Sequence, residues 1–516
     1  MPGFIEKNLA VFSNFIERAT LEDESARIDG ILQSMDARIK VVIFLAAVIA
    51  VSLSRNLIIL SILTAAPFVL APLSRVSISN LARRVFIFIP IFTIIIAVPA
   101  LFMVKGHTAT SLGPVQITSE GMKAASFITL RVTASIAYTM LLLLTTGWYR
   151  ILKALQSFGL PRTVVHLIAI SYRYMHLLIH NLLELLEARR SRVMTRLPFK
   201  RNLEIFAHSS AFLFFRSLHL AEEVEQAMES RGYRAGFEET ATEEPAVVGA
   251  ESVFELTDVL FNYPGGIKGI EIDSLKISKG KCTIILGANG SGKSTLLKML
   301  DALIFPERGE LRVFGDSIDA RLLEDESFRR YFRSRVGLVF QDPDVQCFSP
   351  TVFDELAFGP EQKGLDRAEI SRLVDEALKM MRIEHLSSRY PYSLSGGEKK
   401  RVAIASILTM EPEIYLMDEP TEGLDPSSEG MLIDIIFELI DRGKTLIIAT
   451  QDLMLARHIG DEAIVLSNEK TLLGSGEIEE ILSNEELLKN SGLIHEHRHP
   501  HRKSPAGKGH SHYKDI

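Results

Sequence analysis

Long segments without a charge dominate the first part of this chain. Val85–Val104 is a run of 20 consecutive uncharged residues, and similar apolar runs occupy Val41–Ser54, Leu57–Ser74 and Val132–Tyr149. A bilayer core of about 30 Å is crossed by about 20 apolar helical residues, so the third and fourth runs are long enough to span it. The first two are shorter and need their flanks or a tilt. Together these runs predict an α-helical transmembrane domain, with buried helices of a soluble protein as the alternative.

Two amphipathic stretches follow the apolar runs. Thr163–Arg196 has a wide leucine stripe beside a polar side, and Ile205–Arg231 begins apolar and ends charged. Residues 36–235 carry more Lys and Arg than Asp and Glu, and such an excess next to membrane segments marks the cytoplasmic side. We therefore expect residues 36–235 to form a multi-pass domain of the cell (plasma) membrane, with both amphipathic helices at its cytoplasmic face. Residues 1–35 have an amphipathic pattern, which fits a packed helix or one on the membrane surface.

The second half of the chain has the composition of a soluble α/β domain. The net charge of −7 combines a basic first half with an acidic second half, and an acidic half without a basic stripe argues against nucleic-acid binding. The two cysteines, Cys282 and Cys347, cannot form a disulfide framework, which favours a reducing compartment. Short β-rich runs alternate with helical stretches and predict a largely parallel sheet. The predicted strands are Thr283–Leu286, Val336–Phe340, Ile414–Met417 and Thr445–Ala449.

The remaining boundaries follow from composition. Residues 236–251 are rich in Glu and small residues, which is typical of a linker. Residues 252–494 carry the α/β pattern, and residues 495–516 hold six of the chain's 14 histidines. The last segment also contains Pro and Gly, so we expect a histidine-rich tail that does not fold alone.

One predicted strand runs into a glycine-rich loop. The loop follows Thr283–Leu286, precedes the helical Leu296–Leu300 and fits the pattern G-x-x-x-x-G-K-[ST]. Its glycines let backbone N–H groups converge on phosphate oxygens, and the helix N-terminus adds positive potential. We expect Lys293 to reach the β- and γ-phosphates and the Ser294 hydroxyl to ligate Mg²⁺. The predicted nucleotide-binding residues of this P-loop are Gly287, Ala288, Asn289, Gly290, Ser291, Gly292, Lys293, Ser294 and Thr295.

A second predicted strand ends in two carboxylates. Asp418 and Glu419 follow Ile414–Met417 directly. Asp418 suits a Mg²⁺ ion, usually through water, and Glu419 suits positioning and deprotonating the attacking water. An apolar strand ending in Asp-Glu is common by itself, and its place after a P-loop makes it a candidate catalytic element.

A third motif, Leu-Ser-Gly-Gly-Glu at residues 394–398, decides the kind of nucleotide hydrolase. A glycine pair after a serine at a helix start is another anion-binding terminus. The motif resembles the signature of ABC-type ATPases, which contacts the γ-phosphate bound to the opposite subunit. The resemblance covers about residues 252–492 and implies ATP and Mg²⁺ as bound species. The implied signature residues are Leu394, Ser395, Gly396, Gly397 and Glu398.

Further positions match the same family. The resemblance implies that Tyr263 stacks on adenine, that Gln341 belongs to the Q-loop and ligates Mg²⁺, and that Asp425 belongs to the D-loop facing the other protomer. Glu419 and the switch position are the implied catalytic residues. The switch position is normally a histidine, but here it is Gln451. Glutamine can donate a hydrogen bond to phosphate, yet it cannot become cationic or shuttle a proton, so we expect slower turnover.

The membrane half narrows the family further. Ser191-Arg192-Val193 and Ser230-Arg231-Gly232 end the two amphipathic stretches. With Asp36–Lys40 and Tyr172–Tyr174, they resemble the T component of energy-coupling-factor (ECF) transporters of the cobalt type. In that family, Ala/Ser-Arg-Gly motifs close coupling helices whose arginines dock into the ATPases, which implies coupling roles for Arg192 and Arg231. Val193 departs from the motif's glycine. The expected fold is an α-helical transmembrane domain with amphipathic coupling helices, followed by an α/β P-loop NTPase domain of the ABC type.

These resemblances imply the energising, ATP-hydrolysing subunit of an ECF-type importer. Neutral imidazoles in residues 495–516 suit Co²⁺ and Ni²⁺, so cobalt or nickel ion is the expected cargo, with a vitamin as the alternative. The implied partners are a second ATPase domain from a second copy or a paralogous subunit, a small membrane substrate-binding component and the lipid bilayer. An ABC exporter half and a membrane-anchored ATPase with a mechanical or regulatory role are the other hypotheses.

Overall fold

The computed structural model describes residues 30–92, 95, 97–104, 107–112, 115–192, 199–233 and 252–494. Most of the predicted N-terminal segment, the acidic linker at 236–251 and the histidine-rich tail at 495–516 lie outside the described residues. The chain divides between Ser210 and Ala211 into two compact units, which are described separately below.

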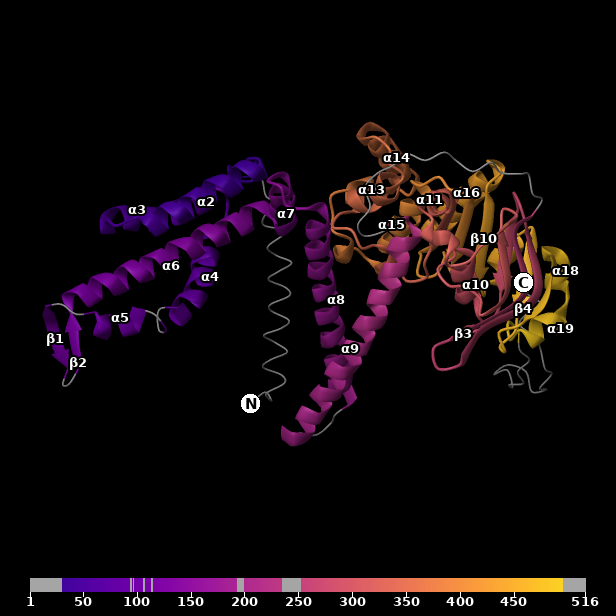
Figure 1. The fold of residues 1–516 in the computed structure, drawn as a ribbon, viewed down its shortest axis with the longest axis horizontal. Helices are drawn as coiled ribbons and strands as arrows, with labels where there is room; N and C mark the ends of the chain where they lie inside the picture. The colour runs from indigo at the N-terminus through magenta and orange to yellow at the C-terminus, as the bar shows by residue number, and fades with distance from the viewer. Residues whose placement is uncertain are drawn as a thin grey trace, which may run out of the picture. The chain divides into compact units, whose positions relative to one another are not determined.

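Four helices form the packed part of the first unit (Figure 1). They are α2 (Ala37–Leu53), α3 (Leu57–Leu73), α4 (Ile78–Phe92) and α6 (Ser119–Thr146), and α6 contacts each of the others. Apolar side chains from all four are buried between them and form one core because each helix is apolar on the face that it turns to α6. This core includes Phe44, Val51, Leu60, Ala71, Leu81, Val85, Ala134 and Leu141.

The other elements of this unit are shorter or lie outside that core. They are α5 (Val98–Met103), the hairpin of β1 (Thr108–Leu112) and β2 (Val115–Thr118), α7 (Trp148–Ser157), α8 (Arg162–Arg192) and the first part of α9 (Phe199–Ser230). Gly147 separates α6 from α7 with a φ of 70°, a left-handed conformation that glycine adopts without a steric penalty.

The predicted membrane runs correspond only in part to single helices. In the described chain, α6 is the one helix long and apolar enough to cross a membrane, while α2 and α3 have 17 residues each. The continuous span expected at Val85–Val104 stays a prediction, because residues 93, 94 and 96, between α4 and α5, lie outside the described residues. A proline lies at the start of α5, and proline favours the first turn of a helix because it has no N–H to donate.

The outward faces of α2 and α3 are strongly apolar. Ile58 is 71% exposed and Leu53 is 73% exposed. An apolar surface of this kind marks contact with a membrane or another protein. Other exposed apolar side chains on these two helices are Ile39, Val42, Ile43, Leu45, Ile49, Ile59, Ile62, Val69 and Leu73.

Two basic side chains tie α2 and α6 together at opposite ends. The Lys40 side chain is buried, and its Nζ donates to the Thr145 carbonyl oxygen at 3.1 Å. Arg131 of α6 donates from Nη2 to the Ser54 carbonyl oxygen at 2.8 Å. The last carbonyls of a helix have no partner within the helix and carry negative partial charge. Each antiparallel helix therefore supplies a cation that caps the C-terminus of the other.

We predict that Lys40→Met lowers the stability of this unit by about 1–3 kcal/mol, because it leaves a buried carbonyl without its donor. The measurement is thermal unfolding of the full chain in detergent, followed by the fluorescence of Trp148, the only tryptophan. Arg38→Met changes an exposed cation two residues away and serves as the matched control. Equal unfolding midpoints for the two variants would contradict the assignment.

The second unit contains two sheets. The six-stranded sheet has the order β12-β11-β5-β10-β9-β8, and only its β11–β12 pair is antiparallel. Its strands are β5 (Cys282–Leu286), β8 (Val336–Val339), β9 (Ile414–Asp418), β10 (Thr445–Thr450), β11 (Glu462–Leu466) and β12 (Leu472–Glu477). Each of the four strands predicted from the sequence is confirmed to within one residue at either end.

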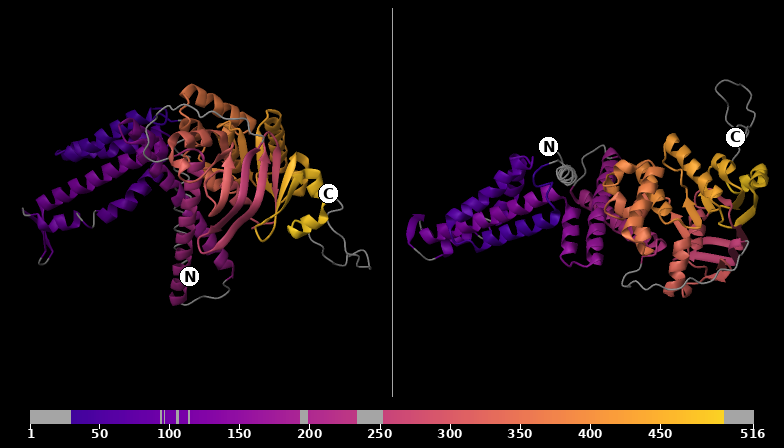
Figure 2. Two further views of the ribbon diagram at one scale, coloured as in Figure 1. Left: turned by 45° about the vertical axis from the view of Figure 1, so that its right-hand side comes forward. Right: turned by 90° about the horizontal axis from the view of Figure 1, so that it is seen from above.

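The second sheet is antiparallel and has the order β4-β3-β6-β7. Its long strands lie side by side in Figure 2. They are β3 (Ser252–Tyr263), β4 (Ile267–Ser278), β6 (Arg308–Val313) and the short β7 (Asp316–Ser317). One apolar core is shared by the two sheets and α10, and a second lies between the six-stranded sheet and the helices of residues 352–441.

The helices of this unit surround the six-stranded sheet (Figure 1). They are α10 (Lys293–Leu300), α11 (Glu326–Arg335), α12 (Pro343–Gln346), α13 (Val352–Gln362), α14 (Arg367–Met380), α15 (Gly396–Leu408), α16 (Pro426–Asp441), α17 (Leu453–Ile459), α18 (Ile478–Ser483) and α19 (Glu485–Asn490).

The parallel sheet determines where the predicted motifs meet. The carboxyl ends of parallel strands share one edge of a sheet, where open α/β proteins bind their ligands. Strand β5 leads into the P-loop, β8 into Gln341, β9 into Glu419 and β10 into Gln451. The sheet therefore gathers four segments that are far apart in sequence at a single edge.

Candidate functional site

The P-loop wraps around its own lysine. Gly292 caps the N-terminus of α10 with a φ of 100°, and a Cβ there would lie 3.0 Å from the Gly269 carbonyl oxygen. Glycine is therefore required both for the backbone conformation and for the close approach. The Lys293 side chain is buried, and its Nζ donates to the Gly287 carbonyl oxygen at 2.8 Å. The loop thus holds a cation and a helix N-terminus at one place, as an anion site requires.

The two carboxylates after β9 face this cation. Lys293 Nζ lies 3.3 Å from Glu419 Oε1. Burial raises the pKa of both Asp418 and Glu419, and the nearby Lys293 partly offsets the rise. Glu419 has a φ of 43°, and its N–H donates to the Ala449 carbonyl oxygen of β10 at 2.9 Å. A non-glycine residue in the left-handed region is strained and persists only where its surroundings hold it.

The surroundings of Asp418 fit a divalent cation. Its Oδ1 is buried without a hydrogen-bond partner among the described residues, and the Ser294 hydroxyl is close enough to lower the pKa of its carboxyl. A buried carboxylate oxygen without a donor is costly unless a cation satisfies it. Hard cations such as Mg²⁺ prefer carboxylate and hydroxyl oxygens. Asp418 and Ser294 therefore have the chemistry of a Mg²⁺ site.

The remaining predicted nucleotide residues lie around this edge. The Tyr263 hydroxyl and Thr295 Oγ1 are 3.0 Å apart, which links the end of β3 to the P-loop helix. Gln341 donates from Nε2 to Glu422 Oε2 at 2.9 Å. Gln451 is exposed directly after β10, and the next residue, Asp452, caps the N-terminus of α17.

The signature segment begins helix α15. Ser395 is its N-cap, and the Glu398 side chain accepts hydrogen bonds from both the backbone N–H and the hydroxyl of Ser395 at 2.8 Å. These bonds hold the pKa of the Glu398 carboxyl below its usual range. Leu394 is buried in the core beside the helix start. The segment is therefore a capping box anchored by a leucine.

The glycine pair of this segment has no packing explanation among the residues that the structure describes. A Cβ at Gly396 would meet nothing within 4 Å, and one at Gly397 would meet only the Gly423 carbonyl oxygen at 3.5 Å. Glycines also allow close approach of a ligand to the backbone. Asp425, expected in the D-loop, caps α16 and accepts bonds from Ser427 and Ser428.

The end of α9 belongs to the second unit. Gly232, with a φ of 83°, ends the helix, and the Tyr233 N–H donates back to the Met228 carbonyl oxygen. Such a left-handed glycine is the usual C-terminal cap. Just before it, the Arg231 side chain is 1% exposed. The Ser-Arg-Gly motif therefore combines a helix stop with one buried arginine.

Arg231 is bound by three different groups. Its Nη1 pairs with Glu355 Oε1 of α13 at 2.5 Å, and its Nη2 donates to the Gln346 carbonyl oxygen of α12 at 2.7 Å. Its guanidinium also lies over the Phe348 ring, 5.0 Å from the centroid. All three partners follow the Q-loop within 14 residues of Gln341. The second predicted coupling arginine, Arg192, ends α8, and its side chain lies outside what the structure describes.

Comparison with known proteins agrees with these geometries. Residues 30–242 match the cobalt transport protein family, and residues 270–422 match the ABC transporter family. The energy-coupling factor transporter ATP-binding protein EcfA of Carboxydothermus hydrogenoformans is 43% identical over 239 residues, which are 46% of this chain and 86% of that protein. The chain belongs to the ABC transporters of the energy-coupling-factor type.

Two further similarities concern the same half of the chain. The nickel import ATP-binding protein NikO of Rhodobacter capsulatus is 43% identical over 246 residues, which are 47% of this chain and 95% of that protein. The solved structure of cbiO1 from Clostridium perfringens, part of the ABC transporter complex cbiONQ, has 34% identity and a TM-score of 0.41, and it covers 47% of this chain and 96% of that one. The match of residues 270–422 to the ABC transporter family and the identity to EcfA show that the second half of this transporter is an ATP-hydrolysing ABC ATPase.

Two partners of Arg231 in this ABC ATPase were not predicted from the sequence. Glu355 is fully buried, and its carboxylate also accepts from the Ser349 N–H at 2.6 Å. It occupies the helix face shared by Val352 and Leu356, and an acid on such an apolar face is a signal that a cation lies opposite. Gln346 contributes a backbone carbonyl, which no side-chain pattern reveals.

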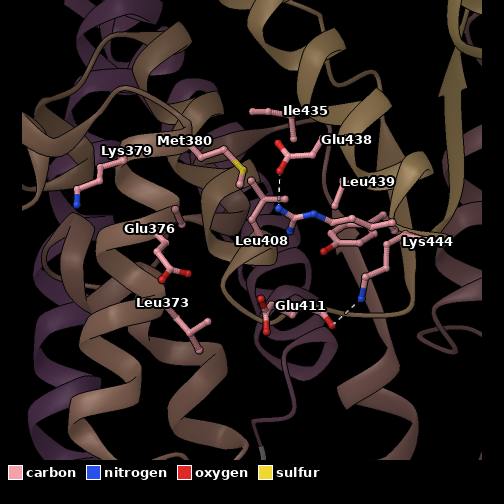
Figure 3. A pocket seen from close by; sticks show the side chains of 13 residues that line it. Leu373, Glu376, Lys379, Met380, Leu408, Glu411, Ile435, Glu438, Leu439 and Lys444 are labelled. Atoms are coloured by element: carbon pink, nitrogen blue, oxygen red, sulfur yellow. Dashed lines mark hydrogen bonds and ion pairs between the residues drawn. The ribbon is translucent and has the colours of Figure 1, made fainter.

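A cavity of about 540 Å³ lies elsewhere in the ATPase, between α14, α16 and the segment that joins α15 to β9 (Figure 3). It contains none of the predicted nucleotide or signature residues. Among its cations, Arg442 pairs with Glu438, and Lys444 donates to the Pro412 carbonyl oxygen at 2.8 Å. Two of its cations are thus already bound by the protein, and we assign no ligand to the cavity.

We predict that Glu355→Gln lowers the stability of the ATPase half by about 3–5 kcal/mol, because it leaves the buried Arg231 guanidinium without its counter-charge. The measurement is the thermal unfolding midpoint of the full chain with an Arg216→Met control, which changes an exposed arginine of α9, the helix that ends beside Arg231. The double variant Arg231→Met/Glu355→Leu should lose less stability than the sum of the losses in the single variants Arg231→Met and Glu355→Leu. Additive losses would contradict a paired interaction.

Proposed function

We propose that this transporter subunit uses ATP binding and hydrolysis to energise uptake of cobalt or nickel ion. The observation that carries the proposal is the Arg231 side chain, which leaves α9 and is buried against Glu355, Gln346 and Phe348 of the ATPase. A residue bound in this way moves with the segment that follows Gln341. Gln341 lies at the edge of the sheet where the nucleotide binds. Arg231 is therefore suited to transmit movements of the Gln341 segment to α9.

The nucleotide chemistry is assigned to residues at the edge of the parallel sheet. The P-loop Gly287–Thr295 binds the phosphates, with Lys293 turning from Gly287 and Glu419 toward them, and the Tyr263 ring stacks on adenine. Glu419 accepts a proton from the attacking water. Its raised pKa matches this role, because a stronger base captures the proton more readily. Gln451 donates a hydrogen bond to the γ-phosphate.

A Mg²⁺ ion would be held by Ser294, Asp418 and Gln341 and would neutralise charge on the phosphates. In the structure Gln341 instead donates to Glu422. Its use in the metal site therefore requires that it release Glu422.

The active assembly needs a second ATPase domain. The signature segment Leu394–Glu398 presents open glycines against which none of the described side chains packs. Together with Asp425 of the D-loop, these residues are suited to complete the nucleotide site of a facing protomer. The second domain comes from another copy or from a paralogous subunit, and a small membrane component supplies the substrate site.

The first unit is placed in the cell membrane as a multi-pass domain. Support comes from α6, which is long and apolar enough to span a bilayer, and from the exposed apolar faces of α2 and α3. Lipid is the environment in which such faces are stable. The ATPase is then cytoplasmic, where its free cysteines Cys282 and Cys347 remain reduced.

The cargo proposal is supported by two similarities. The first part of the chain matches the cobalt transport protein family, and a relative of its ATPase is a nickel import protein. The test is uptake of radiolabelled Co²⁺ and Ni²⁺ into vesicles that contain the subunit and its co-expressed membrane partners. We expect ATP-dependent uptake of one metal by the wild type.

Glu419→Gln provides the matched control for that assay. We expect it to retain ATP binding within about threefold and to lose at least 100-fold in hydrolysis, because it removes the proton acceptor and keeps the shape. Metal uptake should be lost with hydrolysis. ATP-dependent uptake of a vitamin without any metal uptake would overturn the cargo, and uptake by Glu419→Gln would overturn the energy source.

A second prediction concerns the switch position. We expect Gln451→His to raise the rate of single-turnover ATP hydrolysis about 10-fold, since imidazole can exchange protons and carry charge beside the γ-phosphate. ATP affinity should change less than threefold. A rate equal to or below that of the wild type would show that the glutamine does not limit turnover.

A further inference from the structure

A buried lysine lies immediately after the signature segment. Lys400, in the first turns of α15, is 2% exposed. Its Nζ donates to the Gln341 carbonyl oxygen at 2.9 Å and lies 3.5 Å from the carbonyl oxygens of Phe340 and Asp418. One amine therefore contacts both the start of the Q-loop and the end of β9.

The two chain segments that meet at this amine carry complementary parts of the site. Gln341 and Asp418 are two of the three residues assigned above to Mg²⁺, and they come from β8 and β9, which are neighbours in the sheet. Strand β9 is hydrogen-bonded to β8 only up to Met417. Beyond that point β8 and β9 are no longer paired with each other, although Asp418 still pairs with Ala449 of β10, and Lys400 is a donor that contacts both segments.

Electrostatics favours a cation at this position. The negative charges of Asp418, Glu422, Asp342 and Glu419 all act on Lys400. Burying an ammonium ion is costly unless it is hydrogen-bonded and compensated by charge. Here three carbonyl oxygens and the surrounding acids provide both, and a neutral apolar side chain in place of the lysine would remove these contacts.

We propose that Lys400 is a positioning residue that fixes the distance between the main chains of Gln341 and Asp418, and with it the geometry in which the site receives a divalent cation. The inference rests on the proposed function of this site. The same proposal gives α15 two roles. Its N-terminus presents Ser395 to a facing protomer, and its Lys400 contacts both main-chain segments of the metal site in its own chain.

The neighbouring lysine supplies a matched control. Lys399 belongs to the same helix turn and pairs with both Asp344 carboxylate oxygens, at 2.8 and 3.0 Å. It is the Lys400 amine, and not that of Lys399, that contacts the Gln341 and Asp418 carbonyl oxygens. A change that acts only through loss of a lysine from α15 should thus affect both positions, whereas a change in metal geometry should affect Lys400 alone.

The test measures binding of a fluorescent ATP analogue to the full chain, once in EDTA and once in Mg²⁺. Without metal, we expect Lys400→Met and Lys399→Met to bind within twofold of the wild type, because the P-loop is unchanged. With Mg²⁺, we expect the metal-induced gain in affinity to fall at least 10-fold in Lys400→Met and less than twofold in Lys399→Met. The Mg²⁺ concentration that gives half of the effect should rise correspondingly.

Lys400→Gln keeps a shorter donor and should fall between the wild type and Lys400→Met. Thermal unfolding of the metal-free variants tests folding, and the glutamine variant replaces the methionine variant if the latter does not fold. A full Mg²⁺ effect in Lys400→Met or Lys400→Gln overturns the proposal, as does an equal loss of affinity in EDTA. A wild type that binds no ATP analogue would instead overturn the proposed function.

Discussion

The ion pair between Arg231 and Glu355 is the interaction on which the transport proposal depends. Both side chains are buried, and neither has water to replace its partner. A buried pair adds little net stability, but separating it is costly, so it acts as a fixed joint rather than as a source of folding energy. Gly232 ends α9 at this joint. We therefore propose that movement of α13 or of the segment after Gln341 is transmitted to the end of α9.

A second buried network continues from that joint toward the signature helix. Gln346 accepts from Arg231 through its carbonyl, while its side chain accepts from the Phe340 N–H and donates to the Ala403 carbonyl oxygen of α15, both at 2.9 Å. On the side of the nucleotide site, Lys400 donates to the Gln341 carbonyl oxygen. Because every one of these groups is buried and paired, the segment between Gln341 and Gln346 is held by α9 on one side and α15 on the other. Rigid, fully bonded networks of this kind transmit displacement instead of absorbing it.

Sequence reasoning succeeded where a local pattern determines the structure. Local features such as glycine φ angles, helix caps and strand burial determine the backbone at these places. They are the P-loop at Gly287–Thr295, the strands of the parallel sheet and the Ser-Arg-Gly motif at Ser230–Gly232. The partners of Arg231 and Lys400 could not be predicted in this way, because they are backbone carbonyls or depend on how α12, α13 and α15 pack.

We infer that Arg231 couples ATP hydrolysis to movement of the membrane part. The most direct measurement is the number of metal ions taken up per ATP hydrolysed, compared between the wild type and Arg231→Lys in the same vesicles. Lysine keeps the charge but cannot bind Glu355 and the Gln346 carbonyl at once with a planar fork. We expect hydrolysis to stay within about threefold while the ratio falls at least 10-fold. An unchanged ratio would show that force reaches the membrane by another route.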